Sequence, residues 1–193
     1  MAISNDLKLI FIHIPKNAGT SIINSLQLEN HGHYKWKHYK WKHYKLYNDY
    51  YKISVVRNPW DRVVSNYFYI KTINTYWHSY ENIHPDYNLI KNLSFEDTLK
   101  IANKNLNIFK GYGWYLQYDY IVNNDKLMID TLYNFENLQK LINDINDKYN
   151  TNFVLLNQNS TNRKDYHEYY NSITKDIVYK LYKKDIKYFK YEY

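Results

Sequence analysis

Two short segments of the chain combine a basic side chain with the small and hydroxyl residues that bind anions. The first, residues 15–21 (PKNAGTS), follows a short apolar run. Its small residues let backbone amides approach an anion, its hydroxyl residues add donors, and its lysine adds a mobile positive charge. The lysine comes first, unlike that of the common nucleoside-triphosphate loop, which follows the last glycine. We therefore expect a distinct anion cradle, made by Pro15, Lys16, Asn17, Ala18, Gly19, Thr20 and Ser21.

The second segment, residues 55–67 (VVRNPWDRVVSNY), places Arg57 directly after another apolar run. A planar guanidinium suits a phosphate. Ser65 follows Arg57 by eight residues, which is about two turns of helix. One anion can therefore contact both side chains. The alternatives are a salt bridge from Arg57 to Asp61 and a helix serine without a role in binding.

Each segment lies where a strand is expected to end and a helix to begin. Residues 8–14 and 52–57 are short apolar runs of the kind that form buried strands. Thr20 or Ser21 is the expected cap of the helix after the first run, and Asn58-Pro59 stops the second. In open α/β sheets, ligands bind beyond the carboxyl ends of the strands. Both segments are thus expected at the ligand edge of one sheet.

The remaining patterns complete an α/β fold. Residues 71–115 predict loops and short helices, and residues 119–133 predict two strands around an Asn-Asn-Asp turn. Apolar spacing predicts an amphipathic helix over residues 138–145 and a longer one over residues 173–189. Two strand–helix units with further helices predict a central parallel sheet flanked by helices on both faces. The length favours one domain, residues 1–193.

A tandem repeat, HYKWKHYKWKHYK, occupies residues 33–45. Its five-residue period matches neither a helix nor a strand, so we expect a basic aromatic loop without regular structure. Trp36 and Trp41 among lysines and tyrosines also offer stacking surfaces and phosphate partners. A module that binds nucleic acid or glycan is therefore an alternative function, although it leaves both anion segments unexplained.

Composition limits the class of protein. The 193 residues carry a net charge of +7 with 25 tyrosines and no cysteine. The charge favours an anionic partner, and the lack of cysteine excludes disulfides and cysteine nucleophiles. The apolar run near the N-terminus is too short to cross a membrane. We expect a soluble protein without membrane insertion.

Taken together, residues 10–22 (IFIHIPKNAGTSI) and 55–70 (VVRNPWDRVVSNYFYI) resemble the two signatures of sulfotransferases that use 3′-phosphoadenosine 5′-phosphosulfate (PAPS), especially the carbohydrate branch. Residues 156–170 and 182–191 also look like that family's closing segment. The resemblance implies a P-loop-like sulfotransferase fold. By resemblance, residues 15–21 bind the 5′-phosphosulfate, and Arg57 and Ser65 bind the 3′-phosphate. Arg163, next to Lys164, is expected to close over that phosphate, with surface charge as the alternative.

Such a transfer needs charge stabilisation at the leaving phosphate and a base at the acceptor hydroxyl. Lys16 is the predicted catalytic cation, and no metal is expected. The resembling family often has a histidine between its two motifs. Here that interval holds His43, the preferred candidate, then His33, with the other two histidines at positions 31 and 38. His13, inside the first expected strand, is interpreted as a core residue.

The predicted enzyme thus moves a sulfuryl group from PAPS to an acceptor hydroxyl and releases 3′-phosphoadenosine 5′-phosphate (PAP). A carbohydrate acceptor is expected from the resemblance; a phenol is not excluded by the residues, and nucleic acid is disfavoured. A nucleotide-dependent kinase is the other enzyme alternative, but it predicts a lysine after the glycine and a metal-holding aspartate. We expect a cytoplasmic protein of microbial or viral type, unlike the Golgi-anchored members. No pattern indicates an oligomeric state.

Overall fold

The computed structural model describes residues 2–30, 32–72, 83–156 and 163–193. It divides into two compact units, each built from two stretches of the chain. The first unit comprises Met1–Arg57 and Gln117–Ser160, and the second comprises Asn58–Leu116 and Thr161–Tyr193. A single domain over the whole chain stays a prediction.

A five-stranded sheet forms the centre of the first unit, in the order β3-β1-β2-β4-β7. The parallel strands are β2 (Leu9–Ile12), β4 (Tyr51–Val56) and β7 (Thr131–Asn134). Two antiparallel strands, β1 (Ala2–Ser4) and β3 (Glu29–Asn30), extend the sheet beyond β2. The predicted central parallel sheet is confirmed, and the two antiparallel strands add to it.

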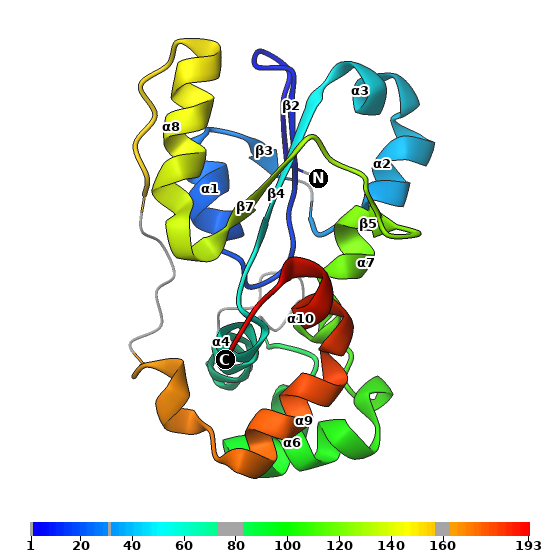
Figure 1. Cartoon of the computed structure of the whole chain (residues 1–193), viewed down its shortest axis with the longest axis vertical. Coiled ribbons are helices and arrows are strands. Elements are labelled where there is room, and N and C mark those ends of the chain that lie inside the picture. Colours follow the sequence, from blue (N-terminus) through cyan, green and yellow to red (C-terminus); the bar gives the residue numbers. More distant parts are fainter. Residues whose placement is uncertain (1, 31, 73–82, 157–162) are drawn as a thin grey trace. The chain divides into compact units, whose positions relative to one another are not determined.

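Helices cover both faces of this sheet (Figure 1). On one face, α1 (Gly19–Ser25) and α8 (Leu138–Tyr149) pack with the strands around a core that includes Phe11 and Ile53. The other face has α2 (Trp36–Lys42) and α3 (Tyr44–Asp49). The rest of this unit consists of a hairpin and short helices: α7 (Tyr118–Ile121), β5 (Val122–Asn123), β6 (Lys126–Leu127) and η3 (Phe135–Asn137). The hairpin confirms the predicted pair of strands around the Asn-Asn-Asp turn.

The second unit is helical in the part that the structure describes. Its longest helix, α4 (Pro59–Lys71), begins directly after the Asn58 cap, as predicted. The others are α5 (Tyr87–Ile90), α6 (Phe95–Lys104), η1 (Leu106–Ile108), η2 (Tyr112–Trp114), η4 (Tyr166–Tyr169), α9 (Ser172–Leu181) and α10 (Lys183–Phe189). Residues from α4, α6, α9 and α10 share one apolar core.

Three local predictions were wrong. The repeat is helical, because Trp36 and Tyr39 lie three residues apart and bury one face of α2 against the unit. The predicted C-terminal helix is two helices that meet at Tyr182, a fully buried residue whose hydroxyl donates to the Trp114 carbonyl at 3.1 Å. The cap of α1 is Ala18, so Thr20 and Ser21 lie inside its first turn.

Candidate functional site

The loop between β2 and α1 has a backbone shape suited to an anion. Lys16 and Ala18 both have left-handed backbone angles, with φ of 70° and 59°. Asn17, between them, has a negative φ. Alternation of left-handed residues with residues of negative φ turns successive backbone amides toward one concave side. Ala18 has no side-chain acceptor, so the first amides of α1 receive no cap from it. The geometry therefore agrees with the predicted cradle over residues 15–21.

Gly19 is required for a reason that the sequence did not reveal. The ring of His13 lies so close to Gly19 that an added Cβ would stand 1.7 Å from His13 Nε2. His13 follows the end of β2 and is buried. The glycine thus allows a buried imidazole to pack directly beneath the start of α1, which agrees with the interpretation of His13 as a core residue.

The second bend reaches the first through Arg57. Because β2 and β4 are neighbouring parallel strands, the loops that follow them emerge at the same edge of the sheet. The Arg57 guanidinium donates to the Lys16 carbonyl at 2.9 Å and lies 3.8 Å from the centre of the Phe135 ring. Stacking on Phe135 and the hydrogen bond to the Lys16 carbonyl fix the orientation of the planar guanidinium. A basic fork is thereby fixed beside the loop that carries Lys16.

A buried amide network, absent from the sequence-based predictions, joins the same two bends. Gln117 Oε1 accepts from Asn17 Nδ2 at 2.7 Å and from the Arg57 backbone amide at 3.0 Å. Gln117 Nε2 donates to the Arg57 carbonyl at 2.9 Å, and Asn17 Nδ2 also donates to the Val55 carbonyl at 2.7 Å. Both side chains are fully buried. In the sequence, the only local indication of this network is that Gln117 is the single amide side chain within the aromatic run of residues 112–122.

The structure brings one candidate base to the loop. His33 Nδ1 lies 3.3 Å from the His13 carbonyl, and the two rings are 4.1 Å apart. A carbonyl only accepts hydrogen bonds, so this contact is a hydrogen bond in the tautomer that carries its proton on Nδ1. His33 therefore has a fixed ring orientation next to the cradle.

The other candidate bases lie in different surroundings. His43 lies at the junction of α2 and α3, with its ring 6.2 Å from that of His38. Partial burial, together with repulsion from Lys42 and His43, lowers the pKa of His38. His31 lies outside the described residues.

Two predicted cofactor residues belong to the second unit. Ser65 is buried in α4. Arg163 forms an ion pair with Asp61 in the first turn of α4, and both side chains are largely buried. Lys164 pairs with Glu168 at 3.2 Å on the surface. The contacts of Ser65 and Arg163 with a nucleotide stay predictions.

Within the described ranges, the structure contains neither a cluster of metal-ligating side chains nor a membrane-spanning helix. No three acidic or histidine side chains there come together as metal ligands would. No helix within those ranges has the length and apolar character needed to cross a bilayer.

These features define an α/β protein in which the two predicted anion-binding bends follow neighbouring parallel strands. The model of the sulfotransferase family matches residues 1–192, so the chain belongs to the sulfotransferase family. This match confirms the predicted family, fold and enzyme class. It argues against the alternative that the protein is a kinase. Sulfotransferases of this family generally use PAPS. No curated protein and no solved structure matched the chain.

Proposed function

We propose that this enzyme transfers a sulfuryl group from PAPS to a hydroxyl group of a carbohydrate. The observation that carries the proposal is the contact between the two bends, in which Arg57 donates to the Lys16 carbonyl at 2.9 Å. One anionic ligand can reach a lysine, a set of loop amides and a guanidinium at this edge. A cofactor with two phosphate groups makes use of all three.

The residues of the first bend would hold the reacting end of the cofactor. PAPS, when bound, supplies the sulfuryl group and leaves as PAP. The amides of residues 16–21 would hold the 5′-phosphosulfate, and the ammonium of Lys16 would stabilise the negative charge that builds on the departing phosphate oxygen. Arg57 would bind the 3′-phosphate as a planar donor. Ser65 and Arg163 keep their predicted roles at this phosphate from the sequence resemblance alone.

His33 is the stronger candidate for the base. The sequence favours His43 ahead of His33, but the contacts of His33 with the carbonyl and the ring of His13 support the reverse order. Nε2 of His33 would accept the proton of the acceptor hydroxyl as that oxygen attacks. The carbonyl of His13 would hold the ring in this orientation and stabilise the imidazolium that forms.

Calorimetry with PAP tests the cofactor. We expect PAP to bind at least about tenfold more tightly than adenosine 5′-phosphate, because a bound phosphate with a charge-assisted partner is worth more than one factor of ten. Equal affinity for the two nucleotides, or no binding of either, would contradict the proposal. Turnover of labelled PAPS with a panel of sugars and phenols then tests the acceptor, and a preference for phenols would exclude a carbohydrate.

Paired asparagine substitutions test the base. We expect His33→Asn to lower kcat by about 10²-fold or more while PAP affinity is unchanged, since general base catalysis typically contributes that much. His43→Asn serves as the matched control and is expected to keep wild-type turnover. The opposite pattern would return the role to His43.

A further inference from the structure

The two copies of the repeat have opposite environments in the fold. Trp36, in the first copy, is 6% exposed, whereas Trp41, in the second, is 92% exposed. A five-residue step along a helix rotates a side chain by about 140° from its equivalent, since each residue turns about 100°. The first tryptophan therefore packs into the unit and the second points to solvent. The core does not use Trp41, whose indole faces solvent.

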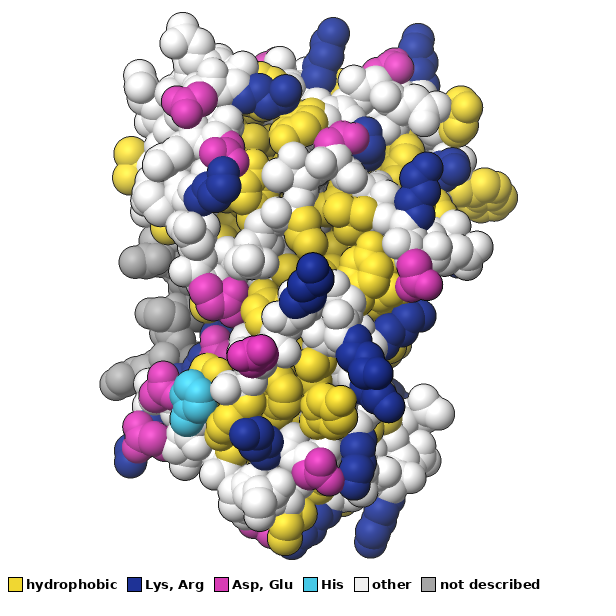
Figure 2. All heavy atoms as spheres, in the orientation of Figure 1, with side chains coloured by type: hydrophobic (Ala, Val, Ile, Leu, Met, Phe, Trp, Pro, Cys, Tyr) yellow, Lys and Arg dark blue, Asp and Glu magenta, His cyan; other side chains and the backbone are white. Residues whose placement is uncertain are grey.

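The surface around Trp41 is basic. Lys37, Lys40 and Lys42 are exposed on α2, and Lys45 is exposed on α3. No acidic residue occurs in the sequence between Glu29 and Asp49. Figure 2 shows protruding hydrophobic side chains beside basic ones over the region of α2 and α3. This surface is called the α2 surface below, and it comprises Lys37, Lys40, Trp41, Lys42 and Lys45.

The charged neighbours of the α2 surface do not cancel its charge. Lys35, at the start of α2, pairs with Asp119 at 3.7 Å. Asp119 is therefore paired with a lysine that does not belong to the α2 surface. The lysine ammonium groups at positions 37 and 40 lie 5.8 Å from the buried Trp36 ring. Their stems thus lie along α2 while their charges face water.

We propose that the α2 surface is a docking site for an anionic polysaccharide. This inference rests on the proposed function, and it extends that function from a carbohydrate acceptor to an acidic polymer held outside the reacting centre. The indole of Trp41 would stack on the face of a sugar ring, while the lysines would pair with carboxylate or sulfate groups along the chain. His33 precedes Lys37, the first residue of the α2 surface, by four residues. A bound polymer would therefore lie close, along the protein chain, to the candidate base.

The ring arrangement favours a polysaccharide over a single-stranded nucleic acid. Single strands are held by several open rings that stack on successive bases. Here the neighbouring Tyr34 ring is stacked on His38, with centroids 4.0 Å apart and an angle of 9° between the planes. That stacking covers one face of Tyr34. Tyr44, on α3, is also exposed, at 64%, so the two most open rings of this region lie on different helices. Separate rings among lysines suit sugar faces flanked by charged groups.

The test is binding of fluorescein-labelled alginate, a polymer of uronic acids, measured by anisotropy. We expect Trp41→Ala to weaken alginate binding about tenfold, the lower part of the range for loss of one stacking side chain. The triple variant Lys37→Gln, Lys40→Gln, Lys42→Gln is expected to weaken binding further and to reduce its dependence on salt. Trp41→Phe keeps an aromatic ring and is expected to bind within about threefold of the wild type.

A matched control removes equal charge elsewhere. Lys183, Lys187 and Lys190 are exposed in the second unit, and their triple glutamine variant is expected to bind alginate as the wild type does. Neutral dextran is expected to bind at least tenfold more weakly than alginate, because it lacks charge. Equal loss in the two triple variants would show nonspecific attraction and would overturn the proposal. Trp41-dependent binding that is tighter for poly(U) than for alginate would also overturn it, in favour of nucleic acid.

PAP affinity of the same variants separates this inference from the proposed function. Wild-type PAP binding with no Trp41-dependent alginate binding would overturn the docking site alone. Trp41-dependent alginate binding without PAP binding would support the docking site and contradict the proposed cofactor. Because the substituted side chains are exposed, circular dichroism spectra of all variants are expected to match the wild type.

Discussion

The two bends proposed to bind anions are built in different ways. The first, between β2 and α1, depends on backbone geometry: two left-handed residues, an alanine cap and a glycine under an imidazole ring. The second, at Arg57 and Asn58, depends on side chains. Arg57 stacks on Phe135, and the Asn58 side chain accepts from the Trp60 amide at 3.0 Å. A bend made of backbone can surround a reacting group, whereas a bend made of side chains offers a few directed contacts.

This difference predicts which substitutions affect chemistry and which affect binding or stability. In the first bend, Lys16 is the proposed catalytic side chain, and the neighbouring residues set the loop shape. In the second bend, each side chain has a separate partner. Gln117 belongs to both, since it contacts Asn17 and both backbone polar groups of Arg57.

The largest expected effect is on turnover, from Lys16→Ala. We expect kcat to fall by about 10²–10³-fold, because a preorganised group that stabilises developing charge typically contributes that much. PAP affinity should fall much less, since the loop amides remain. Steady-state kinetics with labelled PAPS measures the change, and Lys126→Ala, at an exposed lysine of the same unit, is the control. A loss confined to KM would mean that Lys16 only binds the cofactor.

The second effect is a loss of stability in Gln117→Met, which removes the hydrogen bonds that join the two bends. The substitution keeps the side-chain volume but leaves the Arg57 amide and the Arg57 carbonyl without these buried partners. Each buried polar group left unpaired costs about 1–3 kcal/mol, so the free energy of unfolding is expected to fall by about 2–4 kcal/mol. Urea unfolding measures it. Gln139→Met is the matched control, because Gln139 is exposed and bonds only to Asn143 among the contacts described.

If Gln117 sets the relative position of the two bends, its substitution should also change cofactor binding. PAP affinity of the folded Gln117→Met protein should fall relative to the wild type under conditions where both are fully native. Unchanged PAP affinity would mean that Gln117 stabilises the unit without setting the distance between the bends.

The sequence predicted the elements but not this network, for a physical reason. Continuous apolar runs and the Asn58-Pro59 stop are local signals, so both strand–helix units could be located from short windows. The partners of Gln117 are 60 and 100 residues away in the chain. No local pattern encodes such contacts. Only the presence of one amide within an aromatic run marked the residue as unusual.

The repeat shows the opposite failure. The five-residue period argues against a helix if equivalent residues of a repeat are assumed to have the same environment. The segment is nevertheless helical. Trp36 and Trp41 are equivalent in sequence, yet one is buried and the other exposed. The buried pair Trp36 and Tyr39, with its helical spacing of three residues, was the useful signal.

The third effect is steric, from Gly19→Ala in the first bend. The new Cβ would overlap His13 Nε2, and overpacking of a buried site costs about 1–3 kcal/mol. Thermal unfolding measures the loss, and PAP titration is expected to show weaker binding as the loop shifts. Gly111→Ala, which would crowd His84 in the second unit at 2.3 Å, is the control for steric cost without an effect on PAP.

A double variant identifies the clashing partner. In His13→Ala with Gly19→Ala, the imidazole is absent, so the added methyl group has space. We expect a coupling free energy of at least about 1 kcal/mol between the two substitutions. Additive losses would show that Gly19 is needed for its backbone alone.

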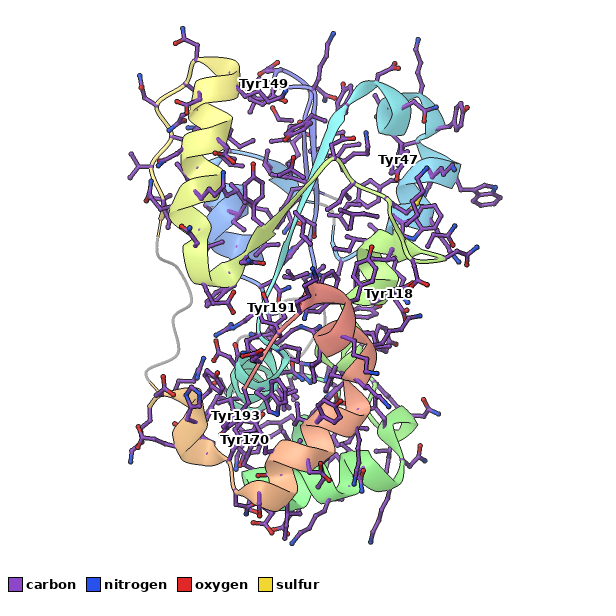
Figure 3. The ribbon with its side chains drawn as sticks, in the orientation of Figure 1. Tyr47, Tyr118, Tyr149, Tyr170, Tyr191 and Tyr193 are labelled. Atoms are coloured by element: carbon purple, nitrogen blue, oxygen red, sulfur yellow. The ribbon has the colours of Figure 1, made fainter. Side chains whose placement is uncertain are left out.

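The smallest expected effect is at the second bend, from Asn58→Ala. Loss of this helix cap is expected to cost about 1 kcal/mol. The Asn58 amide also donates to the Glu192 carbonyl at 2.8 Å, near the point where Tyr193 packs among aromatic rings. Figure 3 labels Tyr193 close to Tyr170, and their centroids are 5.7 Å apart. The side chain therefore also holds the C-terminal residues against α4.

Asn58→Asp separates these two functions. An aspartate still accepts from the Trp60 amide, so the cap is retained, but it cannot donate to the Glu192 carbonyl. If the cap dominates, Asn58→Asp keeps most of the wild-type free energy of unfolding. If the tie to the C-terminal residues dominates, both variants lose stability alike and hydrogen exchange increases over residues 188–193. In either case turnover is expected to change far less than in Lys16→Ala, because the proposed contact of the second bend with the cofactor is made by Arg57 and not by the helix cap.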